Sequence, residues 1–484
     1  MILTPNTIRW WQTINLNIGV FSVGCCIGIF GTVLLDLADI YGSHVDQVVY
    51  IISTRSAGSI AACLVGGVTF RHCNVQQVVI LNSLLGGLCL VLVPVCPSLL
   101  TCHIACFLLG LSIGFIEIGA NVWIITIWKS RSAAVLQFYH FMFGVGAMLA
   151  PFGTEPFLSK KHHFSILSTN VTTDSNSTDL FLNHTAFERV VPVHDVPPLE
   201  RSGDHLLADV ASLDSRIYIP FAVFGSIYMS SAVFMFASYL ADSRDIRNDD
   251  DGQASTTTTT TSHTPKVSAR LELIIVVGSC LYVLLGVASE QNYASMIAVY
   301  VIQSLDFSKS SGAFVVSVFW AAFTLSRVAA TVMSMRVNPM TMLCASHVLL
   351  MLAAVTLMAL PRVEWVVWSM TALYAFGVSP FFGNVCSWAL QYTFLGHGRM
   401  SAIMICVCLG AMMPPIIIGP FIERHPIALI YSAFAIAAIM TATALGLALV
   451  GRHIGRSSRR KAPTAVEHIR NEYALVGDLS PATL

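Results

Sequence analysis

The chain is 484 residues long, with 55% hydrophobic and only 11% charged residues, and its formal net charge at pH 7 is +0. Its mean hydropathy of +0.72 means too much apolar surface for a water-soluble protein, so the composition predicts an integral protein of the lipid bilayer. The neutral charge balance gives no basic surface for nucleic acid, and the sequence has no phosphate-binding loop, metal-spaced Cys/His cluster or nucleophile elbow. We therefore expect no enzyme activity, no bound cofactor and no nucleic-acid partner.

Apolar runs of roughly 20 residues follow one another along the chain, each long enough to cross ~30 Å of hydrocarbon as a helix. Residues 1–12 lack the apolar core and cleavage site of a signal peptide, so we expect the first helix to be retained. The runs lie at about 14–35, 48–68, 78–95, 99–128, 133–157, 217–240, 271–302, 312–335, 340–360, 363–392, 400–422 and 427–450. They predict an all-α polytopic membrane protein with 12 transmembrane helices.

A polar loop, 158–216, separates the fifth and sixth runs and carries three N-glycosylation sequons, at Asn170, Asn176 and Asn183. Three sequons in one loop of a membrane protein indicate that the loop faces the outside or a lumen. Lys and Arg gather at the opposite helix ends and in the C-terminal tail, which the positive-inside rule assigns to the cytoplasm. Both signals place the N- and C-termini in the cytoplasm.

A second polar segment, 241–270, contains an Asp run and the Thr tract 256–261. It is too polar and repetitive to pack, so we expect a flexible cytoplasmic linker. The linker would divide the chain into an N-terminal six-helix half, 1–240, and a C-terminal six-helix half, 271–450. The remaining residues, 451–484, form a basic cytoplasmic tail.

An internal repeat supports these two halves, because residues of the fourth and fifth runs recur 263 or 264 positions later in the tenth and eleventh. The matched pairs are Gly114/Gly377, Asn121/Asn384, Gly146/Gly410, Pro151/Pro415 and Pro156/Pro420. Six helices per repeat give both copies the same orientation, as in transporters built from parallel repeats. We therefore expect Asn121 and Asn384 to approach one central cavity from opposite halves.

Glu117 is an anomaly, since it lies in the middle of the apolar run 108–128. An ionised side chain at the bilayer centre costs roughly 2.5–3.5 kcal/mol on insertion scales, so such residues usually face a bundle interior or a water-filled cavity. Asn121 follows one helical turn later on the same face. Glu290 is a second deep carboxylate, followed by Asn292, and polar interruptions of this kind mark transporter sites. The alternative is that Glu117 only holds helices together by hydrogen bonds.

Several motifs carry a family resemblance. They are Arg55 with Gly66-Gly67, Leu92–Cys96, Leu108–Trp128, Gln137 with His140, Ser317–Arg327 and Ser387-Trp388. They resemble the fucose-permease-like branch of the major facilitator superfamily, and most closely the animal sodium-dependent glucose transporter 1 family. The resemblance implies the major facilitator fold, a plasma-membrane (apical) location, and a central cavity lined by Glu117, Asn121, Gln137 and His140. Departures are Glu117 where the family often has Asp, Arg71-His72 where a loop Asp is usual, and Ser326 in place of Gly.

Other polar residues and the cysteines can be explained by structural roles alone. His140 could equally be a hydrogen-bonded interhelical residue, and Arg55 is expected to pair with a carboxylate or to extend toward the bilayer surface. Asp36 and Asp39, at the end of the first run, are more typical of solvated loop carboxylates. Most cysteines lie in apolar runs and resemble small hydrophobic residues. Cys96 and Cys102 are close enough in sequence to pair at one membrane face.

These features favour a secondary active transporter that moves a sugar-like polar solute, with glucose or another monosaccharide as the first candidate, by alternating access. Coupling to Na⁺ or H⁺ is expected, because carboxylates and side-chain oxygens suit both cations. One alternative is a transporter of another solute, such as urea, an organic ion or an amphiphile. The other is a transport-silent receptor or scaffold, which would leave Glu117 and Glu290 without a function.

Overall fold

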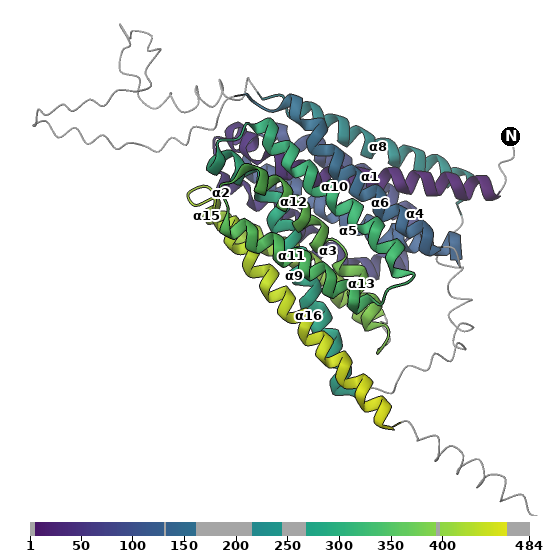
Figure 1. The fold of residues 1–484 in the computed structure, drawn as a ribbon. Coiled ribbons are helices and arrows are strands. Elements are labelled where there is room, and N and C mark those ends of the chain that lie inside the picture. Colours follow the sequence, from purple (N-terminus) through teal and green to yellow (C-terminus); the bar gives the residue numbers. More distant parts are fainter. Residues whose placement is uncertain (1–4, 130–131, 161–214, 244–267, 394–396, 462–484) are drawn as a thin grey trace, which may run out of the picture.

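The computed structural model describes residues 5–129, 132–160, 215–243, 268–393 and 397–461, which form a bundle of long helices (Figure 1). The first half of the chain contains α1 (Pro5–Tyr41), α2 (Val45–Val48), α3 (Tyr50–His72), α4 (Val75–Leu92), α5 (Leu99–Trp128), α6 (Ser132–Thr154) and α8 (Tyr218–Ala241). The second half contains α9 (Ala269–Leu305), α10 (Lys309–Ser334), α11 (Pro339–Ala359), α12 (Glu364–Val378), α13 (Phe381–Ala389), α14 (His397–Ile417), α15 (Gly419–Ile422) and α16 (Ala428–Lys461).

Twelve helical segments of the described chain are long and apolar enough to cross a membrane, which confirms the predicted all-α fold class. The sequons at Asn170, Asn176 and Asn183 lie outside the described residues. So do residues 244–267 of the predicted linker and 462–484 of the tail.

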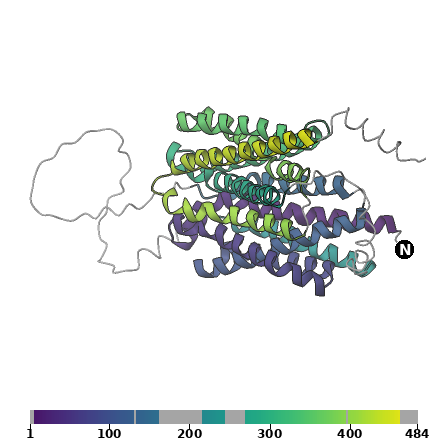
Figure 2. The same ribbon diagram turned by 90° about the horizontal axis from the view of Figure 1, so that it is seen from below.

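The two ends of the helical bundle are distinct. The start of α1 and the end of α16 lie at one end, while α2 and α15 lie at the other (Figures 1 and 2). We call the first the terminus end. The second, which also holds the end of α1 at Tyr41 and the start of α10 at Lys309, is the loop end.

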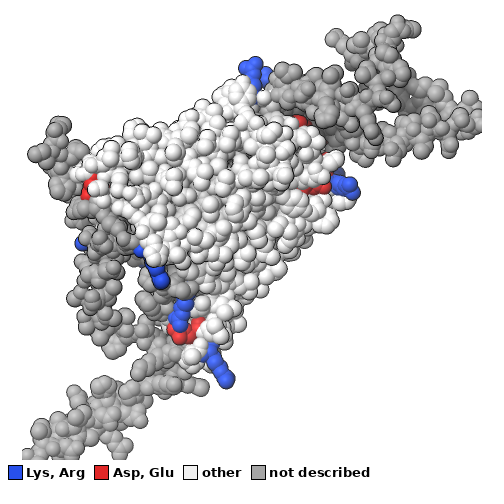
Figure 3. Space-filling view, turned by 180° about the vertical axis from the view of Figure 1, so that it is seen from behind, with Lys and Arg blue, Asp and Glu red and all other residues white. Residues whose placement is uncertain are grey.

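A band without charged side chains crosses the face of the bundle seen in Figure 3. Figure 3 shows Lys, Arg, Asp and Glu at the two ends of the visible face and none across its middle. Large apolar side chains are instead exposed at mid-helix positions, such as Leu81, with 66% of its surface accessible, and Val348, with 67%. Water would not favour such a surface, whereas lipid acyl chains match it. The chain is therefore an integral membrane protein.

Glycines bring neighbouring helices into close contact within each half. A Cβ atom added at Gly110 of α5 would lie 1.7 Å from the backbone oxygen of Arg55 on α3. A Cβ added at Gly24 of α1 would lie 2.0 Å from the backbone oxygen of Phe143 on α6. Small residues allow such approach, and helix association in a bilayer depends on this close packing.

The tenth membrane-spanning segment is broken in the middle. α12 ends at Val378 and α13 begins at Phe381, with Pro380 between them. Proline has no N–H to donate to a carbonyl one turn earlier and its ring crowds that turn, so the helix is interrupted there. The Ser379 hydroxyl donates to the backbone oxygen of Phe323 on α10 at 2.6 Å, which fixes the break against a neighbouring helix.

All thirteen cysteines are free thiols. Cys96 and Cys102, which the sequence placed as a possible pair, remain separate: Cys102 is buried and Cys96 is half-buried just before α5 begins. The structure therefore contains no disulfide at this position.

Candidate functional site

Glu117 lies on α5, near charged residues of both halves. Its charge interacts with those of Glu290 on α9 and Arg327 on α10. The side chain is only half-buried, and no described residue donates a hydrogen bond to its carboxylate. A residue that merely braced helix packing would have such a donor, since buried polar groups are normally hydrogen-bonded. The lack of a donor therefore argues against a purely bracing role for Glu117.

Arg55, on α3, contributes a positive charge to the same region. It is only 4% exposed, its guanidinium carbon lies 5.3 Å from the centre of the Phe30 ring, and its charge interacts with that of Glu117. Its Nη1 has no hydrogen-bond partner among the described residues. The side chain thus stays inside the first half instead of extending to the bilayer surface, and Glu117 is its acidic neighbour.

Arg327 of α10 is the positive charge of the second half, and sequence reasoning did not select it. Its guanidinium carbon lies 4.6 Å from the centre of the Phe323 ring, and its charge interacts with both Glu117 and Glu290. The sequence could have indicated Arg327, because an arginine within an apolar run is as unusual as a glutamate such as Glu117. Arg55, Glu117, Glu290 and Arg327 together form what we call the central charge cluster, to which each half contributes one Arg and one Glu.

The other predicted residues of the first half lie close to this cluster. Asn121 donates from Nδ2 to the backbone oxygen of Glu117 at 2.6 Å, so its amide is engaged by its own helix. Gln137 on α6 is exposed and accepts from the Thr331 hydroxyl on α10 at 3.2 Å, which is a contact between the halves. His140, one turn along α6, is also exposed, and Arg327 is near enough to influence it electrostatically.

The predicted residues of the second half are more deeply buried. Glu290 is 7% exposed, and Gln291 lies beside it, with Nε2 3.4 Å from Oε1. Asn292 is fully buried and donates to the Ser432 hydroxyl of α16 at 2.9 Å, so it packs within the second half. Asn384 on α13 is 6% exposed, and its Nδ2 has no partner among the described residues. Asn384 is therefore buried in protein and not exposed to lipid, whereas the amide of Asn292 is engaged by α16.

The loop end is closed by a second polar group. Lys309, the first residue of α10, places its Nζ 2.5 Å from Asp36 Oδ1, 3.4 Å from Asp39 Oδ2 and 2.5 Å from Ser159 Oγ. Asp36 also accepts from the Ser159 N–H at 2.8 Å and the Ser215 hydroxyl at 2.7 Å. We call these five residues the Lys309 clasp.

The clasp corrects the expectation that Asp36 is a solvated loop carboxylate. Asp36 is 1% exposed and Lys309 is 8% exposed. Two buried opposite charges are stable only with good geometry and further hydrogen bonds, and the clasp provides both. Because Asp36 belongs to the first half and Lys309 to the second, the ion pair joins the halves.

Further contacts join the halves at the loop end. Glu423, just after α15, accepts from the backbone N–H of Val45 at 2.9 Å and lies 3.2 Å from Nδ1 of His44. The Ser310 hydroxyl of α10 donates to Glu155 at 2.5 Å. The halves are thus closely joined at the loop end, whereas further toward the terminus end Gln137 and His140 are exposed and Glu117 is half-buried.

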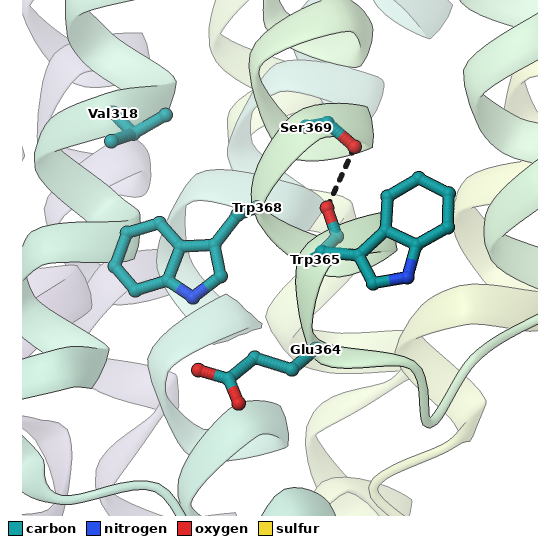
Figure 4. Close-up of a pocket in the computed structure, with 5 residues that line it drawn as sticks. All are labelled: Val318, Glu364, Trp365, Trp368 and Ser369. Carbon is teal, nitrogen blue, oxygen red and sulfur yellow. Dashed lines mark hydrogen bonds between the residues drawn. The ribbon is translucent and has the colours of Figure 1, made fainter.

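A groove on the surface of the second half is unrelated to this site. It is lined by Val318, Glu364, Trp365, Trp368 and Ser369, as Figure 4 shows. Trp365 is 69% exposed, and the Ser369 hydroxyl donates to its backbone oxygen at 2.7 Å. Tryptophans at the end of a membrane helix are typical of the boundary between lipid and water.

The geometry defines a class of protein: a membrane protein of twelve spanning helices with a charged site between two halves. No family model matches the chain. The E. coli fucose:proton symporter has a similar structure, with a TM-score of 0.54 and 14% identity over 90% of this chain and 97% of the symporter. The proton:xylose symporter XylE bound to 6-bromo-6-deoxy-D-glucose has a TM-score of 0.57 and 12% identity over 91% and 95%. The chain therefore has the fold of major facilitator transporters.

Comparison of the sequence identifies a narrower group of similar proteins than comparison of the fold does. Sodium-dependent glucose transporter 1A of Mus musculus is 24% identical over 411 residues, which cover 84% of this chain and 88% of the mouse protein. This match confirms the resemblance drawn from the motifs: the chain is similar over most of its length to sodium-dependent glucose transporter 1.

Proposed function

We propose that this protein is a secondary active transporter that moves a small sugar-like solute across a membrane by alternating access. Two observations together carry the proposal: the loop end is closed, and the charge cluster between the halves includes two half-buried members, Glu117 and Arg327. A transporter that opens its site to one side at a time needs both features in one conformation. The fold shared with sugar symporters and the similarity to glucose transporters support the same function.

Glu117 and Glu290 are the groups we assign to cation coupling. Each half supplies one of them, so their separation and the charges around them change when the halves move. A cation can be linked to solute movement only if it binds one conformation better than another. Na⁺ and H⁺ both suit carboxylates, and the names of the relatives include a sodium-dependent transporter and two proton symporters.

Asn121, Gln137, His140 and Asn384 are the groups we assign to solute recognition. Amide and imidazole groups both donate and accept hydrogen bonds, which matches the hydroxyl groups of a monosaccharide.

We assign the conformation to an inward-open state, with the terminus end in the cytoplasm. This orientation follows from the sequons of the loop and the positive charge of the tail, and we place the protein in the plasma membrane.

An organic ion is the second candidate solute, because the cluster contains two guanidinium groups as well as two carboxylates. Arginine binds carboxylate and phosphate groups in a bidentate way that neutral sugars do not require. A solute with one positive and one negative group would match both kinds of side chain. The two candidates can be distinguished by measuring whether charged solutes compete with sugar for uptake.

Uptake by purified protein in proteoliposomes is the decisive experiment. Labelled glucose, xylose and fucose would be offered with an inward Na⁺ gradient, an inward proton gradient or neither, with protein-free vesicles as the control. We expect accumulation above the external concentration under one of the two gradients. Equilibration without accumulation under any gradient would rule out coupling, and no uptake of any sugar would contradict the proposed solute class.

A further inference from the structure

Two cysteines from opposite halves face each other in the membrane. The Sγ of Cys63 on α3 lies 4.0 Å from the Sγ of Cys408 on α14, and both are free thiols. Each also interacts electrostatically with Glu117, which places the pair beside the central charge cluster. No role in solute or cation binding requires two thiols, so the pair is not explained by the proposed function.

The thiols lie on a line of contact that α3 and the residue before it make with α14 and α15. At the loop end, a Cβ added to Gly419 of α15 would lie 2.6 Å from Val49, which precedes α3. Further along, the Ser53 hydroxyl donates to the backbone oxygen of Met412 at 2.9 Å. The Cys63 and Cys408 contact continues this line toward the terminus end. These helices come from different halves, so anything that joins the two thiols joins the halves.

The distance is suited to a disulfide. An S–S bond is about 2.05 Å long, so the sulfurs must approach by about 2 Å, which rotation about the Cα–Cβ bonds can provide. Cys63 is half-buried and therefore accessible to a small neutral oxidant, whereas Cys408 is only 7% exposed. This difference fits one thiol that reacts first and a second that resolves the intermediate.

We infer that Cys63 and Cys408 form an oxidation site that staples the two halves of the protein through a reversible disulfide. The oxidant is a peroxide. The Cys63 thiolate attacks one peroxide oxygen, the O–O bond breaks, and protonation of the leaving oxygen gives one water and a sulfenic acid. The Cys408 thiolate then attacks the sulfenic sulfur, the S–O bond breaks, and protonation of that oxygen gives the second water. Two thiols are oxidised, one peroxide is reduced, and a dithiol reductant reverses the bond.

The staple also has an effect on transport, which rests on the proposed function. Alternating access requires the halves to move relative to each other, and the bond fixes α3 against α14 in the conformation with the Lys309 clasp closed. Oxidised protein is therefore arrested in that state. The bond itself does not depend on what the protein transports.

A cleavable linker tests the staple directly. A protease site would be inserted within residues 244–267 of the full chain, and the purified protein treated with hydrogen peroxide, cleaved, and separated on a non-reducing gel. We expect the two halves to migrate together after oxidation and separately after dithiothreitol. The Cys63→Ser and Cys408→Ser variants should separate under both conditions. A Cys280→Ser variant is the matched control, because Cys280 lies beside Cys406 within the second half, and it should still be stapled.

Two results would overturn the inference. One is separation of the halves in oxidised wild type; the other is a staple that persists in Cys63→Ser. Elution of each variant as a single species in size-exclusion chromatography would exclude misfolding as the cause. Uptake by the same preparations tests the consequence: oxidised wild type should lose at least tenfold in rate and recover with dithiothreitol, while Cys63→Ser should be unaffected. A staple without loss of uptake would leave the oxidation site intact and contradict alternating access.

Discussion

Lys309 Nζ lies 2.5 Å from Asp36 Oδ1, and this buried ion pair connects the first helix of one half to the start of α10 in the other. Breaking such a pair by removing one partner leaves an uncompensated buried charge, which costs roughly 3–5 kcal/mol. That cost falls only on the conformation in which the loop end is closed. The clasp therefore stabilises one state of the protein relative to any state in which the halves separate there.

The first prediction concerns the equilibrium between conformations with a closed and with an open loop end. Lys309→Met should shift the population toward a conformation with an open loop end, so that Leu158 replaced by Cys, which is buried beside the clasp, becomes labelled by a membrane-impermeant thiol reagent at least tenfold faster. Lys160→Met is the matched control, because this neighbouring lysine is exposed, and it should leave the rate unchanged. The double variant Lys309→Met/Asp36→Asn should return toward the slow rate. Equal labelling rates in all variants would contradict a role for the clasp in closure.

The second prediction concerns Glu117. Glu117→Gln should reach the membrane and exchange solute at equilibrium, but fail to accumulate it, because the amide keeps the shape and loses the charge that a cation requires. Glu117→Asp should keep accumulation with weaker apparent affinity. Glu364→Gln, in the groove on the second half, is the control and should behave as wild type. Normal accumulation by Glu117→Gln would contradict a coupling role for Glu117 and leave Glu290 as the candidate.

The third prediction concerns helix packing. Gly110→Ala should lower stability, because the new Cβ would meet the Arg55 backbone at 1.7 Å and the two helices must separate. Overpacking of this kind typically costs about 1–3 kcal/mol. Gly446→Ala is the matched control, since nothing lies within 4 Å of its added Cβ. Thermal unfolding in detergent should show a lower midpoint for the first variant alone, and equal midpoints would contradict the close packing of α3 on α5.

The fourth prediction concerns topology. If the loop between α6 and α8 faces the outside, Asn170, Asn176 and Asn183 are available for glycosylation. Enzymatic deglycosylation of protein from a eukaryotic host should then increase its gel mobility, and replacing all three by Gln should remove the shift. An epitope at 174–183 should be labelled in intact cells that carry the protein at their surface. Labelling only after permeabilisation would mean that the loop faces the cytoplasm and that the predicted topology is wrong.

Sequence alone predicted the helices well, because each membrane helix satisfies its own backbone hydrogen bonds and needs an apolar run of a fixed minimum length. The break at Pro380 was missed, since proline is tolerated in membrane helices and the run 363–392 shows no other interruption. The sequence singled out Glu117 because a lone charge in lipid is costly. Arg327 obeys the same rule and could have been found by it.

Contacts between the halves were not predictable in this way. Asp36 and Lys309 are 273 positions apart, and each lies at a helix end where a charge needs no special explanation. Only the packing of two separate six-helix units brings them together and excludes water. The same holds for Cys63 and Cys408, which resemble ordinary small hydrophobic residues until the halves are placed side by side.

The composition of the central charge cluster bears on how the protein responds to membrane voltage. Moving one elementary charge across the membrane potential changes the free energy by ~2.3 kcal/mol per 100 mV. Arg55 offsets Glu117 within the first half, and Arg327 offsets Glu290 within the second, so with all four groups ionised the cluster adds no net charge to either half. On the proposed function, we expect the cluster to make reorientation of the empty protein depend little on voltage. The electrical driving force would then act on the bound cation.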